Sequence, residues 1–328
     1  MSFENQTILV TGGTGSFGQC FVQRLLKSHK PKKVIVFSRD ELKQDKMRHE
    51  IQDHRLRFFI GDVRDCSRLK RAFQGVDIVV HAAALKQVPA CEYNPFEAVK
   101  TNILGAQNII DASIDCGVKR VLALSTDKAV NPINLYGATK LVHEKLFVDG
   151  NAYSGDNAAR FSVVRYGNVV GSRGSVIPLF IAKRGSGVLP VTDIRMTRFW
   201  ITLDQGVDFV LRCLGAMHGG EIFVPKIASM RIVDMARIIV PNARLRVIGI
   251  RPGEKLHELL IHSDEARRAR DMKDFFVILP ESPVFTNTHW EHGKSLPEGF
   301  QYSSETNSKW LTPKEMKAMV RPLLKGKA

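Results

Sequence analysis

Short apolar runs alternate with amphipathic stretches along the first half of the chain. The apolar runs are rich in Val and Ile and show no clean polar alternation, which is typical of strands buried on both faces of a parallel sheet. Such strands are predicted at residues 7–11, 33–38, 56–60, 78–82, 121–125 and 162–166. Helices fit between them, so the pattern predicts an α/β fold with a doubly wound parallel sheet of the Rossmann type.

One of these helices has clear boundaries in the sequence. Asn94 is placed as its N-cap and Pro95 as its first residue, and an apolar-periodic run follows to Ala112. Gly117 is expected to lie near its end. This segment therefore predicts a helix from Pro95 to near Gly117.

The organisation changes after Gly171. Here the sequence predicts a loop to residue 187, a helix over 202–214, strands over 221–224 and 245–250, and a turn over 251–255 that enters a helix. We expect two domains, a sheet domain over residues 1–170 and a smaller α/β domain over residues 171–328. Some segments of the second are expected to return to the first.

The net charge of +15 over 328 residues suits an anionic ligand such as a nucleotide, a nucleotide-sugar or nucleic acid. A generally basic surface accounts for most of this charge. The basic clusters at residues 30–33 and 267–270 are short and carry no interleaved aromatic residues. A nucleic-acid groove is therefore not expected.

The five cysteines include no CxxC pair, which indicates reduced thiols rather than a disulfide framework or a zinc site. No metal site is predicted. The sequence enters its first strand at residue 7 without a signal-peptide pattern, and no apolar run is long enough to span a bilayer. These features predict a cytoplasmic protein without a membrane partner.

A glycine-rich turn follows the first predicted strand and opens a helix. Its glycines are spaced G-x-x-G-x-x-G, which permits a tight turn, close backbone approach to a pyrophosphate and a helix N-terminus aimed at that group. A strand–turn–helix context of this kind predicts dinucleotide binding. The expected contacts are Gly12, Thr14, Gly15, Ser16, Phe17 and Gly18.

The end of the second predicted strand indicates which dinucleotide is bound. An acidic residue there selects NAD, whereas an arginine holds the 2′-phosphate of NADP. Ser38 and Arg39 favour NADP, although Asp40 follows directly and could compete. Asp62 and Val63, after the third strand, are placed to meet the adenine, with a solvated turn as the alternative for Asp62.

Small residues follow the fourth predicted strand. Ala82 and Ala83 let the backbone approach the cofactor, and Lys86 is expected beside both cofactor and substrate. His81, at the end of the strand, is interpreted as a core or supporting residue rather than a catalyst.

The segment over residues 125–140 carries the predicted chemistry. Tyr136 and Lys140 are four residues apart, so on a helix they share a face. An ammonium there lowers the tyrosine pKa from about 10. The phenol can then take a proton from an alcohol while a hydride leaves the same carbon. Asp127 and Lys128 add an acid/base pair that a simple alcohol dehydrogenase would not need.

These segments together resemble the extended short-chain dehydrogenase/reductases, and within them the inverting UDP-N-acetylglucosamine 4,6-dehydratases of the bacterial pseudaminic acid pathway. The resemblance runs from Asn5 to Leu311. It is carried by residues 11–18, 37–41, 61–65, 82–89, 125–140, 165–175, 197–203 and 249–258.

The resemblance implies a mechanism. Tyr136, assisted by Lys140, takes the C4 hydroxyl proton as the C4 hydride moves to NADP⁺, and Thr126 hydrogen-bonds the C4 oxygen. Lys128 then removes the C5 proton and Asp127 protonates the departing C6 hydroxyl. The hydride returns to C6, and C5 is reprotonated on the opposite face. The product is UDP-2-acetamido-2,6-dideoxy-β-L-arabino-hex-4-ulose, and the cofactor is regenerated.

These roles set requirements on protonation. Asp127 must carry a proton when it acts, which burial or a negative neighbour would favour. Lys128 must be neutral, which requires desolvation or a positive neighbour such as Lys86 or Lys140. Retaining relatives commonly carry a glutamate where Lys128 stands, so this lysine is the main residue-level argument for inversion. A lysine that binds phosphate or faces solvent is the alternative.

The resemblance also implies substrate contacts. Asn168 matches an asparagine that contacts the pyrophosphate, and Arg251 matches an arginine that grips it. Arg195 and Arg198 are further candidates for which surface charge is an equal interpretation. The expected substrate-binding residues are Lys86, Thr126, Asn168, Val176, Arg251 and Glu254. The predicted partners are UDP-N-acetylglucosamine and further copies of the chain, as a dimer or hexamer.

Two alternatives stay open. A 4-epimerase or a retaining dehydratase would share the fold, but a simple epimerase would not need Asp127 and Lys128, and retaining relatives are often membrane-anchored. A non-catalytic NADP-binding protein would typically lose Tyr136 and Lys140, which are both present.

Overall fold

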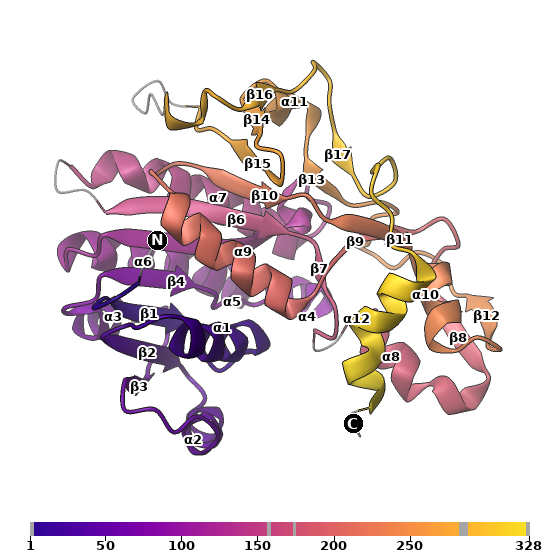
Figure 1. Cartoon of the computed structure of the whole chain (residues 1–328), viewed down its shortest axis with the longest axis horizontal. Helices are drawn as coiled ribbons and strands as arrows, with labels where there is room; N and C mark the ends of the chain where they lie inside the picture. The colour runs from indigo at the N-terminus through magenta and orange to yellow at the C-terminus, as the bar shows by residue number, and fades with distance from the viewer. Residues whose placement is uncertain (1–2, 156–158, 173–174, 282–287, 326–328) are drawn as a thin grey trace.

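A ten-stranded sheet forms the centre of the molecule (Figure 1). The computed structural model describes residues 3–155, 159–172, 175–281 and 288–325. Along the sheet the strands are β16 (Lys294–Ser295), β14 (Ala269–Asp271), β15 (Phe275–Ile278), β10 (Ile222–Pro225), β6 (Arg160–Tyr166), β5 (Arg120–Thr126), β4 (Ile78–His81), β1 (Thr7–Thr11), β2 (Lys33–Ser38) and β3 (Leu56–Ile60).

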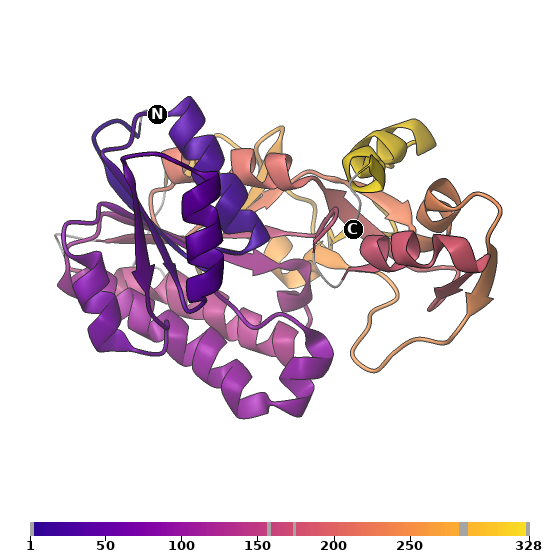
Figure 2. The ribbon, with the colours of Figure 1, turned by 90° about the horizontal axis from the view of Figure 1, so that it is seen from below.

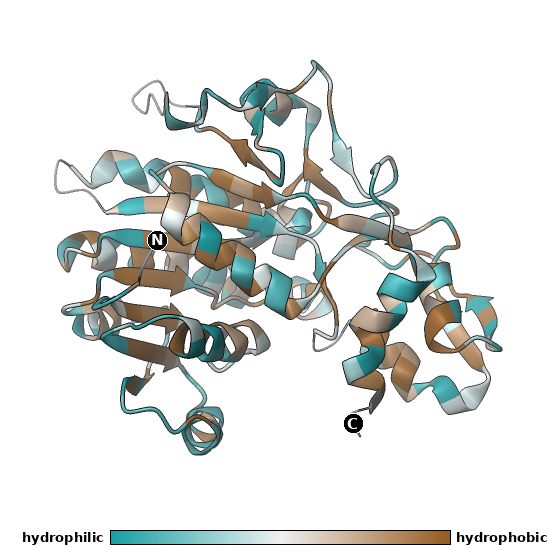
Figure 3. Cartoon of the chain, in the orientation of Figure 1, coloured by the Kyte–Doolittle hydropathy of each residue, from teal (hydrophilic) through white to brown (hydrophobic). Residues whose placement is uncertain are grey.

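The strands from β3 to β10 pair in parallel, and β15, β14 and β16 extend the sheet antiparallel. The order 3-2-1-4-5-6 is that of a doubly wound dinucleotide-binding sheet, which confirms the predicted fold class. Strands β1, β4 and β10 are buried throughout, β2 is buried at all but its first residue, and these strands are coloured mainly as hydrophobic in Figure 3. The order reverses between β1 and β4, where such sheets bind ligands at the carboxyl ends of their strands.

Helices cover both faces of this sheet (Figure 2). Helices α1 and α9 pack together on one face, whereas α3, α6 and α7 pack together on the other. The helices of this part are α1 (Ser16–Ser28), α2 (Glu41–Glu50), α3 (Cys66–Phe73), α4 (Val88–Tyr93), α5 (Pro95–Val99), α6 (Gly105–Asp115), α7 (Leu135–Tyr153) and α9 (Leu203–Ala216), with a π-helical segment η1 (Lys100–Leu104) and a 3₁₀ turn η2 (Asp127–Ala129).

A smaller body lies beside the carboxyl ends of the strands (Figure 1). Its core lies between α8, α10, α12 and β8. Its elements, with the three short strands that lead to them, are β7 (Asn168–Val169), α8 (Val176–Ala182), η3 (Arg184–Ser186), β8 (Val188–Val191), β9 (Thr197–Ile201), β11 (Ala228–Arg231), α10 (Ile232–Ile239), β12 (Arg244–Val247) and α12 (Pro313–Lys325). The remaining elements pack with the core of the large sheet and are β13 (Leu259–Ile261), α11 (Ser263–Ala266), η4 (Thr288–Trp290) and β17 (Tyr302–Ser303).

Two local predictions were wrong and one holds in part. The helical segment predicted from Asn94 begins at Pro95 with Asn94 in the N-cap position and ends at Asp115, but the π-helical segment η1 divides it into α5 and α6, and the Asn94 side chain donates to Ala90 O instead of capping the helix. The expected loop over 171–187 contains α8, while Arg173 and Gly174 lie outside the described residues. The turn over 251–255 leads to β13 and not to a helix.

A buried ionic network ties the C-terminal segment to the sheet. The Arg165 guanidinium pairs with Glu144 (2.5 Å) and with Glu265 (2.9 Å), and it donates to Leu260 O (2.9 Å). Ser125 Oγ donates to the same Glu144 carboxylate at 2.5 Å. Because Glu144 lies on α7 and Ser125 on β5, the network fixes both elements that carry the residues predicted to be catalytic.

Replacing Arg165 with Met is expected to lower the free energy of unfolding by about 3–5 kcal/mol, since it leaves two buried carboxylates without their cation. Arg212→Met is the matched control, because its ion pair with Asp274 is exposed and is expected to contribute less than about 1 kcal/mol. Urea unfolding of both variants measures the difference. Equal losses in the two variants would contradict the structural role of the network.

Candidate active site

A cavity of about 1100 Å³ runs along the carboxyl ends of the strands and into the smaller body. It brings together nearly all the residues expected at a cofactor or substrate. Those lining it are Gly12, Thr14, Gly15, Ser16, Phe17, Gly18, Ser38, Arg39, Asp62, Val63, Ala82, Ala83, Lys86, Thr126, Lys128, Tyr136, Lys140, Asn168, Val176, Arg251 and Glu254. Asp127 is fully buried and reaches this set through hydrogen bonds.

The glycine turn lies at the reversal point of the sheet. Gly12 has φ +64°, and a Cβ placed on it would come within 2.9 Å of Ala83 N after β4. At Gly18 a Cβ would come within 2.4 Å of the Gly13 backbone. Helix α1 can therefore approach the turn this closely only because residues 12 and 18 are both glycine. Gly15, the N-cap of α1, provides no side-chain cap, which leaves the first amides of the helix without that partner.

Charged side chains gather where β2 and β3 end. Arg39 lies 3.6 Å from Asp62, and the Lys43 ammonium pairs with Asp40. Ser38 Oγ accepts a hydrogen bond from Gln44 Nε2 at 3.0 Å. Burial raises the pKa of Asp62, but hydrogen bonds from Arg64 outweigh it, so the pKa of Asp62 is lowered. Asp62 is therefore ionised and held between two arginines.

These features fit a dinucleotide cofactor. The close-packed glycine turn and the helix N-terminus would hold its pyrophosphate. Arg39 and Lys43 line the cavity at its far end and supply the cations that a 2′-phosphate would use.

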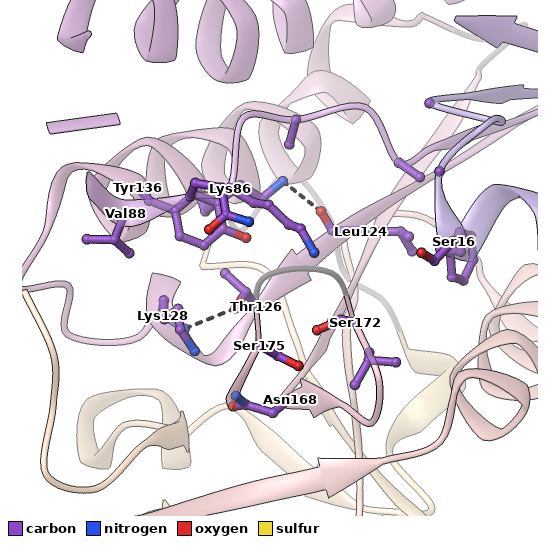
Figure 4. Close-up of a pocket in the computed structure, with 18 of the residues that line it drawn as sticks. Ser16, Lys86, Val88, Leu124, Thr126, Lys128, Tyr136, Asn168, Ser172 and Ser175 are labelled. Carbon is purple, nitrogen blue, oxygen red and sulfur yellow. Dashed lines mark hydrogen bonds between the residues drawn. The ribbon is translucent and has the colours of Figure 1, made fainter. Parts of the chain in front are cut away.

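The predicted acid/base residues form one hydrogen-bonded row at the end of β5. The side chains of Thr126 and Tyr136 are hydrogen-bonded to each other. Thr126 Oγ1 donates a hydrogen bond to Asp127 Oδ1 at 2.9 Å. Lys128 Nζ donates to the same Asp127 oxygen, also at 2.9 Å. Figure 4 shows Tyr136, Thr126 and Lys128 around one part of the cavity, while Ser16 lies toward the other end.

The expected lowering of the Tyr136 pKa by Lys140 is wrong for this structure. Burial raises the pKa of Tyr136 to about 12, and the cation that opposes this is Lys128. Lys140 Nζ instead donates to Leu124 O at 2.7 Å (Figure 4). Burial lowers the pKa of Lys140 to about 7, so this lysine can lose its proton near neutral pH.

The expectation that desolvation or a positive neighbour makes Lys128 neutral is also wrong, although burial and the cation Arg198 both act in that direction. Burial lowers the pKa of Lys128, but the carboxylates of Asp127 and Glu258 outweigh burial and raise it above its ordinary value. Lys128 Nζ lies 2.9 Å from Asp127 and 3.3 Å from Glu258. Its resting state is therefore the ammonium.

Polar atoms without partners face the row from across the cavity. Asn168 and Ser175 lie opposite Lys128 and Thr126 in Figure 4. Asn168 Oδ1 and Ser175 Oγ are buried and have no hydrogen-bond partner among the described residues. Such atoms are costly unless a ligand or water bonds to them, so they indicate a polar ligand here.

Of the three arginines considered for substrate binding, two line the cavity and one lies on the surface. Arg251 is half exposed at the cavity and lies 3.8 Å from Glu254, whose Oε2 is buried and lacks a partner among the described residues. Arg198 is buried and lines the cavity, whereas Arg195 is exposed and bound to Asp193 at 2.8 Å.

His81 lies in the core, as interpreted from the sequence. Its Nδ1 is bonded to Thr11 Oγ1 at 2.7 Å. Burial, with a smaller effect of Lys140, lowers the pKa of His81 to about 3. His81 is therefore a neutral packed residue.

Three charged residues of the cavity were missed by sequence reasoning: Lys43, Lys255 and Glu258. The motif over residues 249–258 contains two of them. The helix predicted after residue 255 gave no reason to place Glu258 in the site, because only the extended path into β13 brings it to Lys128.

The described residues contain no group of three or more His, Cys, Asp or Glu side chains arranged to hold a metal ion. None of the helices in those parts of the chain has both the length and the apolar character needed to cross a bilayer.

Comparison with known sequences identifies close relatives. A family model described as polysaccharide biosynthesis protein matches residues 8–280. A protein of Campylobacter jejuni subsp. jejuni named UDP-N-acetylglucosamine 4,6-dehydratase (inverting) is 53% identical over 323 residues, which cover 96% of this chain and 97% of that protein. A Rickettsia conorii protein named UDP-glucose 4-epimerase is 45% identical over 284 residues, covering 84% of this chain and 83% of the relative.

Solved structures agree with the fold. Pen from Bacillus thuringiensis superposes with a TM-score of 0.90 at 37% identity, covering 98% of this chain and 99% of the other. The dTDP-glucose 4,6-dehydratase DesIV of Streptomyces venezuelae, solved with NAD bound, gives a TM-score of 0.70 at 26% identity, covering 76% of this chain and 87% of DesIV.

Proposed function

Because this chain belongs to the polysaccharide biosynthesis protein family and is an extended short-chain dehydrogenase/reductase of the dehydratase group, we propose that it is a UDP-N-acetylglucosamine 4,6-dehydratase that inverts C5. Its cofactor is NADP in this proposal. The product is UDP-2-acetamido-2,6-dideoxy-β-L-arabino-hex-4-ulose.

The observation that carries the proposal is the Asp127–Lys128 pair bonded through Thr126 to Tyr136. Oxidation at C4 needs one base, and Tyr136 supplies it. Loss of water across C5 and C6 needs a second base and an acid, and the pair supplies both. The residues that bind sugar in this proposal are Lys86, Thr126 and Val176, with Asn168, Arg251 and Glu254 at the diphosphate.

The residues act in sequence. Tyr136 takes the C4 hydroxyl proton in its phenolate form, while Thr126 hydrogen-bonds the C4 oxygen. Burial lowers the pKa of Lys140 to about 7, so this lysine can take up or release a proton near neutral pH. NADP held by the glycine turn over residues 12–18 would supply a hydride acceptor for C4 and a hydride donor for C6. Lys128 takes the C5 proton made acidic by the 4-ketone, and Asp127 gives its proton to the leaving C6 hydroxyl, so that water is released.

Arg39 supports NADP over NAD in this proposal. Arg39→Ala is expected to weaken NADP binding about 10-fold or more, because it removes a charge-assisted contact to the 2′-phosphate worth about 1.5–3 kcal/mol. NAD binding is expected to change much less. Fluorescence titration with both dinucleotides measures this.

Arg48→Ala is the matched control for Arg39, since it removes another exposed arginine that stacks on Phe58. It is expected to leave the affinity for both dinucleotides unchanged. Equal weakening of NADP and NAD in Arg39→Ala would contradict the assigned contact.

The proposed function is tested by incubating the purified protein with UDP-N-acetylglucosamine and NADP⁺ and analysing the nucleotide products by mass spectrometry. A product lighter by one water is expected. Recovery of the substrate alone would contradict the proposal and favour a binding protein.

A second candidate function is 4-epimerisation, which is favoured by the similarity to a protein named UDP-glucose 4-epimerase. An epimerase would give a product of unchanged mass with inverted C4. The same incubation distinguishes the two, because the epimer separates from the substrate on chromatography without loss of water.

A 4-keto-6-deoxy product is suited to further conversion toward pseudaminic acid for a flagellin or surface glycan. We place the enzyme in the cytoplasm, as a dimer or hexamer. Residues 1–170 bind NADP in this proposal, and residues 171–328 mainly bind substrate.

A further inference from the structure

A second carboxylate lies against the Lys128 nitrogen. Glu258 Oε1 is 3.3 Å from Lys128 Nζ, on the side supplied by the smaller body, while Asp127 approaches from the end of β5. The side chains of both carboxylates are almost fully buried, whereas that of Lys128 is 26% exposed. The lysine nitrogen is therefore held between two fixed anions, and the Lys128 side chain is the most exposed of the three.

Glu258 is held rigidly on its own side. Its backbone N–H donates to Ser304 Oγ at 2.9 Å, and its carbonyl accepts from Ser304 N–H at 2.8 Å. Arg198 Nε lies 3.5 Å from Glu258 Oε1, and the Arg198 guanidinium also donates to the carbonyls of Lys255 and Leu256. The carboxylate therefore has a fixed position relative to Lys128.

The other Glu258 oxygen, Oε2, is buried and has no hydrogen-bond partner among the described residues. Burying a carboxylate with one unpaired oxygen costs free energy, and an apolar or neutral residue would avoid that cost. A residue kept at such a cost beside a reactive lysine indicates a role in function.

We propose that Glu258 is a positioning residue for Lys128: its carboxylate fixes the Lys128 nitrogen beside Asp127 and holds on that nitrogen the proton that Asp127 later gives to the C6 hydroxyl. This rests on the proposed dehydration. The resting pair is Asp127 carboxylate and Lys128 ammonium. One proton passing along their 2.9 Å hydrogen bond produces the carboxylic acid and the free amine together.

The elimination then balances within the pair. The free Lys128 amine takes the C5 proton, and the C5–H electrons form the C5=C6 double bond as the C6–O bond breaks. The Asp127 proton joins the leaving hydroxyl as water. Lys128 ends as the ammonium and Asp127 as the carboxylate, which is the arrangement seen in the structure. The pair therefore regains its starting charge.

The test compares Glu258→Gln with the wild type by measuring how fast acetic anhydride labels Lys128 between pH 7 and 10, read by peptide mass spectrometry. The groups facing Lys128 are the anions Asp127 and Glu258, the cations Arg198 and Lys255, and the phenol Tyr136. Removing one close anion is expected to lower the Lys128 pKa by about 1–3 units and so raise its labelling about 10-fold or more at pH 8.

Kinetics give the second readout. Because the acid and the amine arise from one shared proton, kcat falls at high pH as the Asp127–Lys128 pair loses that proton, and Glu258→Gln shifts this fall to lower pH by about one unit or more. On the plateau below this fall, kcat is expected to be about 10-fold lower in Glu258→Gln with little change in KM, and the isotope effect from C5-deuterated substrate is expected to increase. Glu258→Asp, which keeps the charge, is expected to restore the wild-type pH dependence.

Glu305→Gln is the matched control. Glu305 is an exposed carboxylate that pairs with His257 (3.4 Å) and follows Ser304. It is expected to alter neither labelling nor kcat.

The inference is overturned if Glu258→Gln leaves Lys128 labelling unchanged, or if kcat falls equally at every pH, which would indicate a purely structural role. Because labelling needs no substrate, it separates this inference from the proposed function. If the wild type releases no water from the substrate, the proposed dehydration is contradicted. If Lys128 is nevertheless labelled faster in Glu258→Gln than in the wild type, the coupling of Glu258 to Lys128 still holds.

Discussion

Tyr136→Phe is expected to lower kcat for loss of water from UDP-N-acetylglucosamine by about 10³-fold, because the phenolate form of Tyr136 is the base for the first step. Ring packing is kept and only the hydroxyl is removed, so the buried core formed with Cys91 and Ala98 is expected to stay intact. Product formation followed by chromatography measures the rate. A thermal melt of the variant is expected to match that of the wild type within a few degrees.

Tyr153→Phe is the matched control for this change. Tyr153 ends the same helix, α7, and its ring is exposed, so the loss of its hydroxyl is expected to leave kcat unchanged. A Tyr136→Phe variant that kept more than about a tenth of the wild-type rate would contradict the role of Tyr136 as general base.

Lys128→Gln is expected to lower formation of the dehydrated product by about 10³-fold as well, since the amide cannot take the C5 proton. The change keeps a polar side chain that can still donate to Asp127 and Glu258, so these buried carboxylates retain a partner. Oxidation at C4 does not need Lys128. The rate in this variant is therefore expected to depend on deuterium at C5 and not at C4.

Lys145→Gln is the matched control, because Lys145 lies on the surface of α7 and pairs with the exposed Glu281. It is expected to keep full activity. Rapid dehydration by Lys128→Gln would show that another group removes the C5 proton.

Much of the sheet could be predicted from the sequence. A strand buried on both faces needs a continuous apolar run, and the runs at residues 7–11 and 33–38 are such strands over the predicted lengths. The run at residues 56–60 is also a strand of the predicted length, but it is the partly exposed edge strand β3. The division of the helical segment that follows Asn94 was harder to predict. The π-helical segment at residues 100–104 packs against other elements, and no local sequence pattern indicates it. A glycine with positive φ at residue 117 still marks the end of that region.

The residues of the site could be predicted better than its charges. Spacing places Tyr136 and Lys140 on one face of α7, but the partner of Lys140 is a backbone carbonyl of β5 that no spacing reveals. Lys128 was expected to be neutral through desolvation or a positive neighbour, and it has both in burial and Arg198. Its anionic neighbour Glu258 comes from a segment 130 positions away, and the path of that segment depends on Ser304 and Arg198. Protonation in a buried site depends on such distant contacts.

The most direct test of the account is proton NMR of the reaction with UDP-N-acetylglucosamine in D₂O. The account predicts a new C6 methyl signal, deuterium at C5, and ring couplings of the inverted C5 configuration. A methyl signal with unchanged C5 configuration would contradict the role assigned to Lys128, and the absence of a methyl signal with NADP⁺ supplied would contradict the dehydration itself.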